Sequence, residues 1–297
     1  MRTLFYRLIG FFLGLGWLLA ACAAPAPVLP NNQPDSTSAP LLPTLAVSPT
    51  PTAEALTPTP EACRETQGSL DRSEIQTPLL NKPMRYVVYR PPCYAANANQ
   101  RYPVLYLLHG QNYDESQWLR LGVPASLDRL ITSGELPPFL VVLPFDYSFK
   151  QPSEYKFEQV FIQLLIPQID QDYRTRSEAA GRAIGGLSRG GAWAIRLGIR
   201  HPALFSAIGG HSPAIFYADM DSLPTRLQAV PEDQRPRLWL DAGDKDSEYQ
   251  TVQTFEKALN ELGLPHEWHS YLGWHEEAYW SAHVAEYLRW YAAEWKP

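Results

Sequence analysis

One serine in this chain stands in a setting that supports covalent chemistry. The motif Gly-Leu-Ser-Arg-Gly at 186–190 follows the apolar run 182–185 and precedes a helical pattern that ends at Arg200. A strand, a Gly-x-Ser-x-Gly turn and a helix in this order are typical of a nucleophile elbow, because only glycine fits the crowded positions beside the serine. Such a turn exposes the hydroxyl at the carboxyl end of a sheet. The sequence therefore predicts that Ser188 is a nucleophile.

A nucleophilic serine needs a base and an acid that orients the base, and in this type of elbow both follow the serine along the chain. The strand-like run 238–241 leads into a turn that carries Asp241, Asp244 and Asp246. Asp246 lies three residues beyond Gly243 and can reach an imidazole, whereas Asp241 ends the strand and is expected to make local hydrogen bonds. We predict Asp246 as the acid, with Asp244 and then Asp241 as alternatives.

His275 is the predicted base. The histidines that follow these acids are His266, His269, His275 and His283. The first two flank or lie in the last predicted strand, and the fourth lies in the final predicted helix. His275 comes directly after Gly-Trp in the loop that follows the last strand. On that loop it can accept the proton of Ser188, while Asp246 fixes its tautomer and orientation.

Two backbone N–H groups are predicted to stabilise the oxyanion. The apolar strand 104–108 runs directly into His109-Gly110-Gln111. In hydrolases of this plan, the loop after that strand and the residue after the nucleophile each supply one N–H. We assign the N–H groups of Gln111 and Arg189. His109 is expected to hold the turn through hydrogen bonds rather than to act as a base.

These residues require a sheet whose strands end on one rim. The predicted strands are 84–89, 104–108, 140–143, 182–186, 207–210, 238–241 and 267–271, and the predicted helices are 125–132, 157–173, 190–200, 251–262 and 279–295. The inner strands are short and continuously apolar, as in parallel strands that are covered on both faces. Right-handed crossovers then place the loops after them on one edge. The pattern predicts an α/β fold with one doubly wound, mostly parallel sheet, helices on both faces and no separate lid domain.

The first 62 residues differ in composition from the rest. Residues 1–21 combine a basic start with a short apolar run and small residues before Cys22, as in a lipoprotein signal peptide. Residues 22–62 are rich in Pro and Thr, which predicts a disordered linker. Residues 63–297 are predicted to form the single α/β domain. We expect lipidated Cys22 to anchor an exported protein on the extracytoplasmic side of a bacterial envelope; an ordinary cleaved signal is the alternative.

Cysteine usage and charge add further constraints. Once Cys22 is assigned to the anchor, Cys63 and Cys93 remain as a pair, and in an oxidising compartment they are predicted to form a disulfide, with two free thiols as the alternative. The formal net charge of −6 is mild and basic residues do not cluster, which argues against a nucleic-acid partner. No metal site and no cofactor are predicted, and the membrane is expected as a partner only through the lipid.

Four motifs in sequence order resemble the “putative esterase” (esterase D-like) family of α/β-hydrolases. They are RYPVLYLLHG at 101–110, DESQW at 114–118, GLSRGG at 186–191 and GWHEEAYW at 273–280. The resemblance covers nearly all of the chain after Pro83. It implies an α/β-hydrolase fold and a triad of Ser188, Asp246 and His275.

One residue departs from the family pattern. Many relatives have methionine directly after the nucleophile, where this chain has Arg189. A cation at the start of a helix opposes the helix dipole. We therefore expect either a nearby carboxylate that pairs with the guanidinium, or a guanidinium that faces the pocket and binds an anionic group of the substrate.

The resemblance implies a serine carboxylic-ester hydrolase that works through an acyl-enzyme, and it leaves the substrate open. The family includes feruloyl, acetyl-xylan and siderophore esterases, S-formylglutathione hydrolases and mycolyltransferases. Aromatic residues on or near the rim loops, Tyr113, Trp118, Tyr147 and Trp274, favour sugar-linked feruloyl or acetyl esters, because flat rings stack on sugars and phenols. The expected partner is thus a small-molecule or oligosaccharide ester. The alternatives are a siderophore-ester hydrolase, an acyltransferase of the same family and an inactive surface binding protein on this scaffold.

Overall fold

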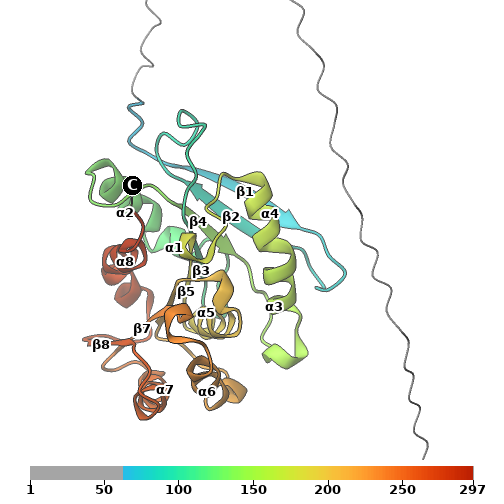
Figure 1. Ribbon diagram of the computed structural model, residues 1–297, viewed down its shortest axis with the longest axis vertical. Helices are drawn as coiled ribbons and strands as arrows, with labels where there is room; N and C mark the ends of the chain where they lie inside the picture. Colours follow the sequence, from blue (N-terminus) through green and yellow to red (C-terminus); the bar gives the residue numbers. More distant parts are fainter. Residues whose placement is uncertain (1–62, 297) are drawn as a thin grey trace, which may run out of the picture. The chain divides into compact units, whose positions relative to one another are not determined.

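A single sheet organises the part of the chain that the computed structural model describes, residues 63–296. The predicted signal peptide, the linker and Cys22 lie outside the described residues. The sheet is 8-stranded, in the order β1-β2-β4-β3-β5-β6-β7-β8 (Figure 1). Its strands are β1 (Ser69–Ile75), β2 (Met84–Arg90), β3 (Val104–Leu108), β4 (Leu140–Pro144), β5 (Arg182–Leu187), β6 (Ala207–His211), β7 (Arg237–Gly243) and β8 (Glu267–Tyr271).

In the sheet order β4-β3-β5-β6-β7-β8, every neighbouring pair of strands is parallel. The strand β2 is antiparallel to both of its neighbours, β1 and β4. All seven strands predicted from the sequence are present with small changes at their ends, which confirms the mostly parallel sheet. The strand β1 was missed. Its residues Ser-Leu-Asp-Arg-Ser-Glu-Ile are mostly exposed, because an edge strand can be polar and then lacks the apolar run that marks a buried strand.

Helices cover both faces of the sheet, as predicted. They are α1 (Gln117–Arg120), α2 (Val123–Thr132), α3 (Phe157–Val160), α4 (Ile166–Asp172), α5 (Arg189–Arg200), α6 (Ser222–Gln228), α7 (Tyr249–Glu261) and α8 (Glu277–Ala292). Figure 1 shows α2 and α8 together on one side of the sheet and α3 to α7 on the other. The buried side chains of α1, α2 and α8 form one apolar cluster with the sheet, and those of α3 to α7 form a second cluster. Among residues 63–296, no insertion forms a separate lid domain, and none of the helices has the length and apolar character of a membrane span.

The predicted helix 157–173 is not regular. A π-helical turn at Phe161–Leu165 separates α3 from α4, and Pro167 is the second residue of α4. Proline has no N–H to donate to the carbonyl four residues earlier, and its ring crowds that carbonyl. The wider turn relieves this conflict without ending the helical path. The apolar face persists through the irregular turn, since Phe157, Phe161 and Ile169 are fully buried.

Ion pairs connect α3 to α5, the helix that begins at the elbow. Glu158 lies 2.9 Å from Nε of Arg196 and 2.8 Å from Nε of Arg200, and its carboxylate also contacts His201. Burial alone would raise the pKa of Glu158, but hydrogen bonds from His201 and Arg200 and the charge of Arg196 lower it to about 2. The carboxylate therefore stays charged far into the acid range.

This lowered pKa predicts a pH-dependent contribution to stability. Because the pKa of Glu158 falls from 4.5 to about 2 on folding, its stabilising effect is complete above about pH 4.5 and disappears as the pH falls toward 2. At pH 7, Glu158→Gln should lower the free energy of unfolding by about 1–3 kcal/mol. Urea denaturation should show that the free energy of unfolding of Glu158→Gln differs less from that of the unchanged protein at pH 3 than at pH 7.

A matched control is Glu261→Gln, because Glu261 faces Lys257 at 3.7 Å in a pair whose side chains are 65% and 74% exposed. Exposed pairs contribute little, so this variant should unfold at nearly the same urea concentration as the unchanged protein. A Glu158→Gln effect that is as large at pH 3 as at pH 7 would contradict the ion-pair explanation.

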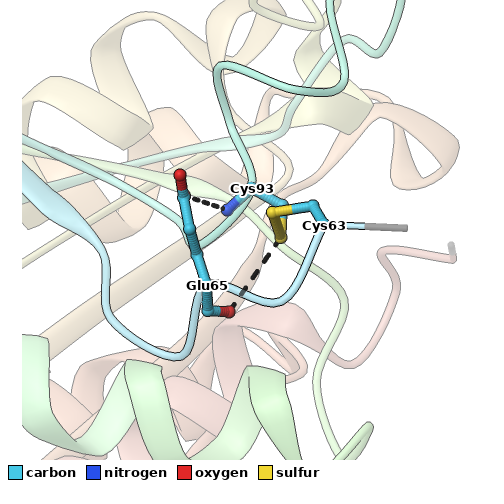
Figure 2. Close-up of side chains that lie close together, drawn as sticks. All are labelled: Cys63, Glu65 and Cys93. Carbon is cyan, nitrogen blue, oxygen red and sulfur yellow. Dashed lines mark hydrogen bonds between the residues drawn. A yellow bond between two sulfur atoms is a disulfide. The ribbon is translucent and has the colours of Figure 1, made fainter. Parts of the chain in front are cut away.

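The predicted disulfide between Cys63 and Cys93 is present and closes a sequence separation of 30 residues (Figure 2). A loop of this length corresponds to about 3–4 kcal/mol in the chain-entropy model. The Cys93 N–H also donates to the Glu65 carboxylate at 2.8 Å. Both sulfurs are in the disulfide bond, so the Cys63, Glu65 and Cys93 group offers no thiolate pair to a metal.

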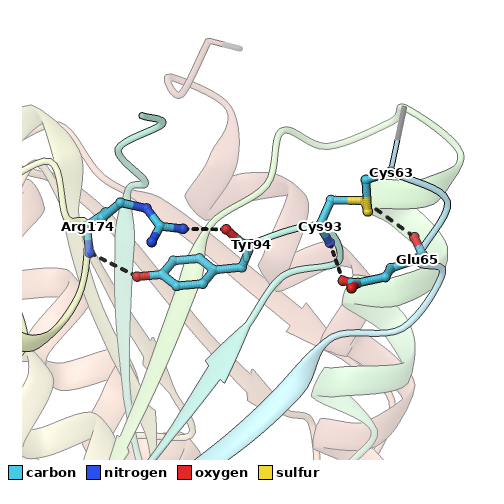
Figure 3. Close-up of a disulfide and its surroundings, with 5 residues drawn as sticks. All are labelled: Cys63, Glu65, Cys93, Tyr94 and Arg174. Carbon is cyan, nitrogen blue, oxygen red and sulfur yellow. Dashed lines mark hydrogen bonds between the residues drawn. A yellow bond between two sulfur atoms is a disulfide. The ribbon is translucent and has the colours of Figure 1, made fainter. Parts of the chain in front are cut away.

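Beside the disulfide, contacts between Tyr94 and Arg174 also hold the segment after β2 against the domain (Figure 3). The Arg174 N–H donates to the Tyr94 hydroxyl at 3.0 Å, and the Arg174 guanidinium donates to the Tyr94 carbonyl and lies over its ring (Figure 3). β2 runs antiparallel to β4. The carboxyl end of β2, which leads to Cys93, therefore lies at the end of the sheet opposite the carboxyl ends of the parallel strands. The described domain thus begins at Cys63 on the edge opposite Ser188.

Candidate active site

The elbow has the backbone that the sequence predicts. Ser188 has φ 52° and ψ −123°, a left-handed conformation that few side chains adopt, between the end of β5 and the start of α5. A Cβ atom on Gly186 would collide with the Gly190 backbone, and one on Gly190 would collide with the carbonyl of Leu108. Glycine is therefore required at both positions, and the turn holds the serine hydroxyl above the carboxyl end of the sheet.

Three loops at this edge bring Ser188, His275 and Asp246 together in one row of hydrogen bonds. Nε2 of His275 lies 2.9 Å from Oγ of Ser188, and Nδ1 of His275 lies 2.8 Å from Oδ1 of Asp246. The serine immediately precedes α5, the aspartate follows β7 and the histidine follows β8. A neutral His275 with its proton on Nδ1 would donate to the carboxylate and accept the serine proton, which is the arrangement of a general base.

The two alternative acids are bound elsewhere. Asp244 is exposed and accepts a hydrogen bond from the Gly273 N–H at 2.9 Å. Asp241 is fully buried below the site and accepts hydrogen bonds from the side chains of Trp239, Tyr279, Tyr287 and His211. Its local hydrogen bonding was expected from its place at the end of the strand. Neither carboxylate contacts His275.

The Asp246 side chain is fully buried, so its charge state depends on its hydrogen bonds. Burial raises the pKa of Asp246, but the hydrogen bonds from His275 and the Glu248 N–H, together with the nearby Ser212 hydroxyl, outweigh burial and hold the pKa below its ordinary value. The Glu248 N–H lies 2.7 Å from Oδ1. At neutral pH Asp246 is thus an ionised carboxylate that faces an imidazole.

Both predicted oxyanion donors lie at the cavity that contains Ser188. Gln111 and Arg189 line this cavity, and within residues 63–296 neither backbone N–H donates to another protein group. The Arg189 guanidinium points elsewhere. Its Nε lies 3.0 Å from Oδ2 of Asp146, and the two side chains are only 7% and 6% exposed. The expectation of a compensating carboxylate is therefore confirmed, and the guanidinium is not free to bind an anionic substrate.

The cavity has a volume of about 600 Å³ and opens to solvent beside Ser188 and His275. It is lined by Gly110, Gln111, Asn112, Tyr113, Leu187, Ser188, Arg189, Ala214, Ser247, Glu248, His275, Glu276, Glu277 and Trp280. Of the four aromatic residues predicted to bind substrate, Tyr113 lines the cavity and is 43% exposed. Trp274 is 57% exposed next to His275 but lies outside the lining.

The prediction for Trp118 is wrong. Its side chain is only 2% exposed and its indole N–H donates to the Leu108 carbonyl at 3.0 Å, so it packs under the loop. Tyr147 is half-buried outside the cavity lining, and its hydroxyl accepts the Asn81 N–H at 2.7 Å. Aromatic residues fill cores as readily as they line pockets, and the sequence pattern does not separate the two uses.

Several site residues were missed from the sequence. The lining carboxylates of Glu248, Glu276 and Glu277 belong to the loops and the helix start that follow β7 and β8. Asp146 follows β4 at the same edge, and this position directly after a buried strand was a usable signal. No local pattern distinguishes Glu248, Glu276 and Glu277 from solvated loop residues.

Comparisons with known proteins agree with this architecture. A family model described as “Putative esterase” matches residues 77–291. “Endo-1,4-beta-xylanase/feruloyl esterase” of Xylanibacter ruminicola is 36% identical over 118 residues, which cover 37% of this chain and 16% of that protein. “Esterase Rv1288” of Mycobacterium tuberculosis is 26% identical over 234 residues, which cover 60% of this chain and 49% of that protein. The chain thus spans less than half the length of these curated relatives.

Solved structures share the same fold. A ferulic acid esterase superposes with a TM-score of 0.69 at 26% identity and covers 77% of this chain and 100% of its own. The feruloyl esterase module of Clostridium thermocellum, complexed with sinapinate, has a TM-score of 0.68 at 19% identity and covers 78% of this chain and 90% of its own. An S-formylglutathione hydrolase of Staphylococcus aureus has a TM-score of 0.65 at 19% identity, over 77% and 98% of the two chains. The latter two likenesses concern the fold alone.

Proposed function

Since this chain belongs to the “putative esterase” family of α/β-hydrolases, we propose that it is a carboxylic-ester hydrolase and that Ser188, His275 and Asp246 are its catalytic triad. The observation that carries the proposal is the unbroken row of hydrogen bonds from the serine hydroxyl through the imidazole to a buried carboxylate. Among the described residues, His275 is the only base that has a hydrogen bond to the Ser188 hydroxyl. The assignment therefore rests on geometry within this chain and does not depend on any relative.

The first half of the reaction would form the acyl-enzyme. Oγ of Ser188 attacks the ester carbonyl carbon while Nε2 of His275 takes the hydroxyl proton. The carbonyl oxygen becomes an oxyanion and accepts hydrogen bonds from the N–H groups of Gln111 and Arg189, which have no other protein partner among the described residues. The imidazolium, stabilised by Asp246, returns the proton to the departing alcohol.

The second half would repeat the sequence with water. His275 takes a proton from a water molecule in the cavity, and the resulting hydroxide attacks the acyl carbon. The same two N–H groups stabilise the second oxyanion, and Ser188 leaves with the proton of His275. If an alcohol attacks the acyl carbon in place of water, the product is a new ester and the reaction is acyl transfer. Because the cavity is open to solvent, water and an alcohol can both reach the acyl-enzyme and compete for it.

For the substrate, we propose neutral esters that link feruloyl or acetyl groups to carbohydrate. Two relatives carry feruloyl esterase in their names, one of them joined to a xylanase. The cavity chemistry supports a neutral substrate, since Glu248, Glu276 and Glu277 line it. Only Glu277 has an ion-pair partner among the described residues, Arg120 at 3.0 Å. Exposed aromatic side chains at this edge, such as Tyr113 and Trp274, suit sugar or phenol rings.

A panel of esters tests this proposal. We expect hydrolysis of p-nitrophenyl acetate and methyl ferulate, and release of ferulate or acetate from substituted xylan. A neutral p-nitrophenyl ester should have a kcat/KM at least about fivefold above that of an analogue with a terminal carboxylate, because unpaired carboxylates repel the anion. Added salt should narrow this difference. The matched control is the double change Glu248→Gln and Glu276→Gln, which should remove most of the difference in kcat/KM between the two esters.

Three outcomes would redirect the proposal. Preferred cleavage of a catecholate trilactone over all sugar esters would favour the siderophore-ester alternative. Products dominated by transfer to an added sugar alcohol would favour an acyltransferase. A failure to hydrolyse any ester, with retained binding of oligosaccharide, would favour the inactive binding protein.

For the location, we propose that the enzyme acts outside the cytoplasm and is held to the membrane by a lipid on Cys22. The sequence Leu-Ala-Ala-Cys at 19–22 motivates the anchor, and the disulfide between Cys63 and Cys93 suits an oxidising compartment. The described domain begins at the sheet edge opposite Ser188.

Cys22→Ser should prevent lipidation and move the protein from the membrane fraction to the soluble fraction. The variant is expressed in a bacterium, and both fractions are immunoblotted. Incorporation of labelled palmitate is measured in the same cells. The control Cys63→Ser removes one sulfur of the disulfide and should leave the lipid anchor intact. Membrane retention of Cys22→Ser would indicate that the apolar run 8–21 stays uncleaved and acts as the anchor.

A further inference from the structure

We propose that Asp146 is a positioning residue that holds the two N–H groups of the oxyanion hole, those of Gln111 and Arg189, in register with each other. The proposal rests on the proposed function, because it assigns a role within that site. The two donors come from separate segments, the loop after β3 and the start of α5. Asp146 comes from a third segment, the loop after β4, and it contacts both.

The first contact fixes the start of α5. Oδ2 of Asp146 accepts hydrogen bonds from Nε of Arg189 at 3.0 Å and from Nε1 of Trp193 at 2.8 Å. These side chains lie one helical turn apart, so a single carboxylate oxygen sets the rotation of the first turn about its axis. A second guanidinium nitrogen of Arg189 donates to the carbonyl of Lys150 in the same loop. The backbone N–H of Arg189 is thereby fixed relative to Asp146.

The second contact reaches the loop after β3 through a histidine. The Asp146 N–H donates to Nε2 of His109 at 2.9 Å, so this nitrogen carries no proton. The proton of the neutral ring is on Nδ1, which donates to the Gly110 carbonyl at 2.7 Å. Burial lowers the pKa of His109, which keeps the ring neutral and maintains this pattern at neutral pH. His109 thus holds the turn, as the sequence predicted.

That carbonyl shares a peptide unit with the Gln111 N–H. The described chain has no cis peptide bond, so the C=O of Gly110 and the N–H of Gln111 point in opposite directions. Holding the carbonyl on the His109 ring therefore directs the N–H away from the ring. The side chain of Gln117, which is fully buried, fixes the preceding peptide by accepting the Gly110 N–H at 2.8 Å.

A charge effect and a positioning effect make opposite predictions for Asp146→Asn. The change leaves the Arg189 guanidinium without its carboxylate. If charge controlled the rate, the uncompensated cation near Ser188 would stabilise the oxyanion and kcat would rise. If position controls the rate, the carboxylate that orients Arg189 and Trp193 is lost, the donors drift and kcat falls.

The test measures kcat and KM for p-nitrophenyl acetate and the inhibition constant of phenylboronic acid, whose tetrahedral adduct places an oxygen between the donors. Asp146→Asn should lower kcat by about 10–100-fold and change KM less than about threefold, because a hole donor acts mainly in the transition state. Boronate affinity should fall in parallel with kcat. Arg189→Met should give the same pattern, and the double variant should lose no more than the worse single variant.

The matched control is Asp170→Asn. Asp170 pairs with the buried Arg182 at the opposite end of β5, so its loss removes a comparable buried partner far from the cavity. This control should lower the melting temperature and leave kcat unchanged. The proposal is overturned if kcat rises in Asp146→Asn, if kcat stays within twofold of the unchanged enzyme, or if Asp170→Asn loses as much. If Asp146→Asn does not fold, Trp193→Phe replaces it, because this change removes one hydrogen bond to Asp146 without altering any charge. A fall in kcat with little change in KM then supports the positioning role, and an unchanged kcat overturns it.

Failure of the proposed function gives a different result. In that case the unchanged protein shows no activity above its Ser188→Ala variant, whatever residue stands at 146. Ser188-dependent hydrolysis that ignores Asp146→Asn would leave the proposed function standing and overturn only the positioning role.

Discussion

Ser188→Ala is expected to lower kcat for p-nitrophenyl acetate by about 10⁴–10⁶-fold, and His275→Ala should have an effect of the same order. Removing either residue ends formation of the acyl-enzyme, because the hydroxyl has no other base within hydrogen-bond reach among the described residues. The two changes should not add, so the double variant should lose no more than the single ones. Steady-state kinetics with active-site titration would measure this.

The folded state should survive both changes. Both side chains line a cavity that is open to solvent, and the serine at φ 52° is replaced by a residue with similar backbone preferences. The melting temperature should therefore change little. His283→Ala is a matched histidine control, since His283 lies in α8 and its Nδ1 lies 3.2 Å from Glu286. A Ser188→Ala enzyme that keeps more than a tenth of the activity would contradict the triad.

Asp246→Asn is expected to lower kcat by about 10²–10⁴-fold, less than the loss of the nucleophile. An asparagine can donate its amide N–H to Nδ1 of His275, which would move the ring proton to Nε2 and leave no acceptor for the Ser188 hydroxyl. Activity should fall while KM stays similar, because the carboxylate is buried and does not line the cavity.

Asp244→Asn is the comparison that decides the identity of the acid. Asp244 is exposed, and within residues 63–296 its carboxylate accepts a hydrogen bond only from the Gly273 N–H, so its loss should change kcat by less than about threefold. Asp241→Asn should act through stability, because it disrupts a fully buried group of hydrogen bonds. A crippled Asp244→Asn variant beside a nearly normal Asp246→Asn variant would overturn the acid assignment.

Local sterics made the elbow predictable from the sequence alone. Gly186 and Gly190 are needed because the backbone passes too close to leave room for a Cβ, and this requirement is visible in the spacing of the residues. The inner strands were also predictable, since parallel strands covered on both faces need continuous apolar runs. The order of the chemistry-bearing loops along the chain followed from these elements. The prediction of Ser188 and His275 required only this local information and the order of the loops along the chain.

Long-range packing decided the features that the sequence left open or predicted wrongly. The choice among Asp241, Asp244 and Asp246 depends on how the loops after β7 and β8 meet, and only Asp246 lies within hydrogen-bond distance of His275. Trp118 packs under the β3 loop because an aromatic ring gains as much from the core as from a pocket.

Arg189 shows the same division most clearly. Its position one residue after the predicted nucleophile led us to predict that its backbone N–H is an oxyanion donor, and Arg189 lies at the cavity that contains Ser188. The direction of its side chain was not, because the partner carboxylate is 43 residues away on another strand's loop. Local sequence determined which residues can form the site, since backbone sterics and apolar runs act over a few residues. Tertiary packing determined which charges are buried and paired, because burial and pairing depend on segments that only the folded sheet brings together.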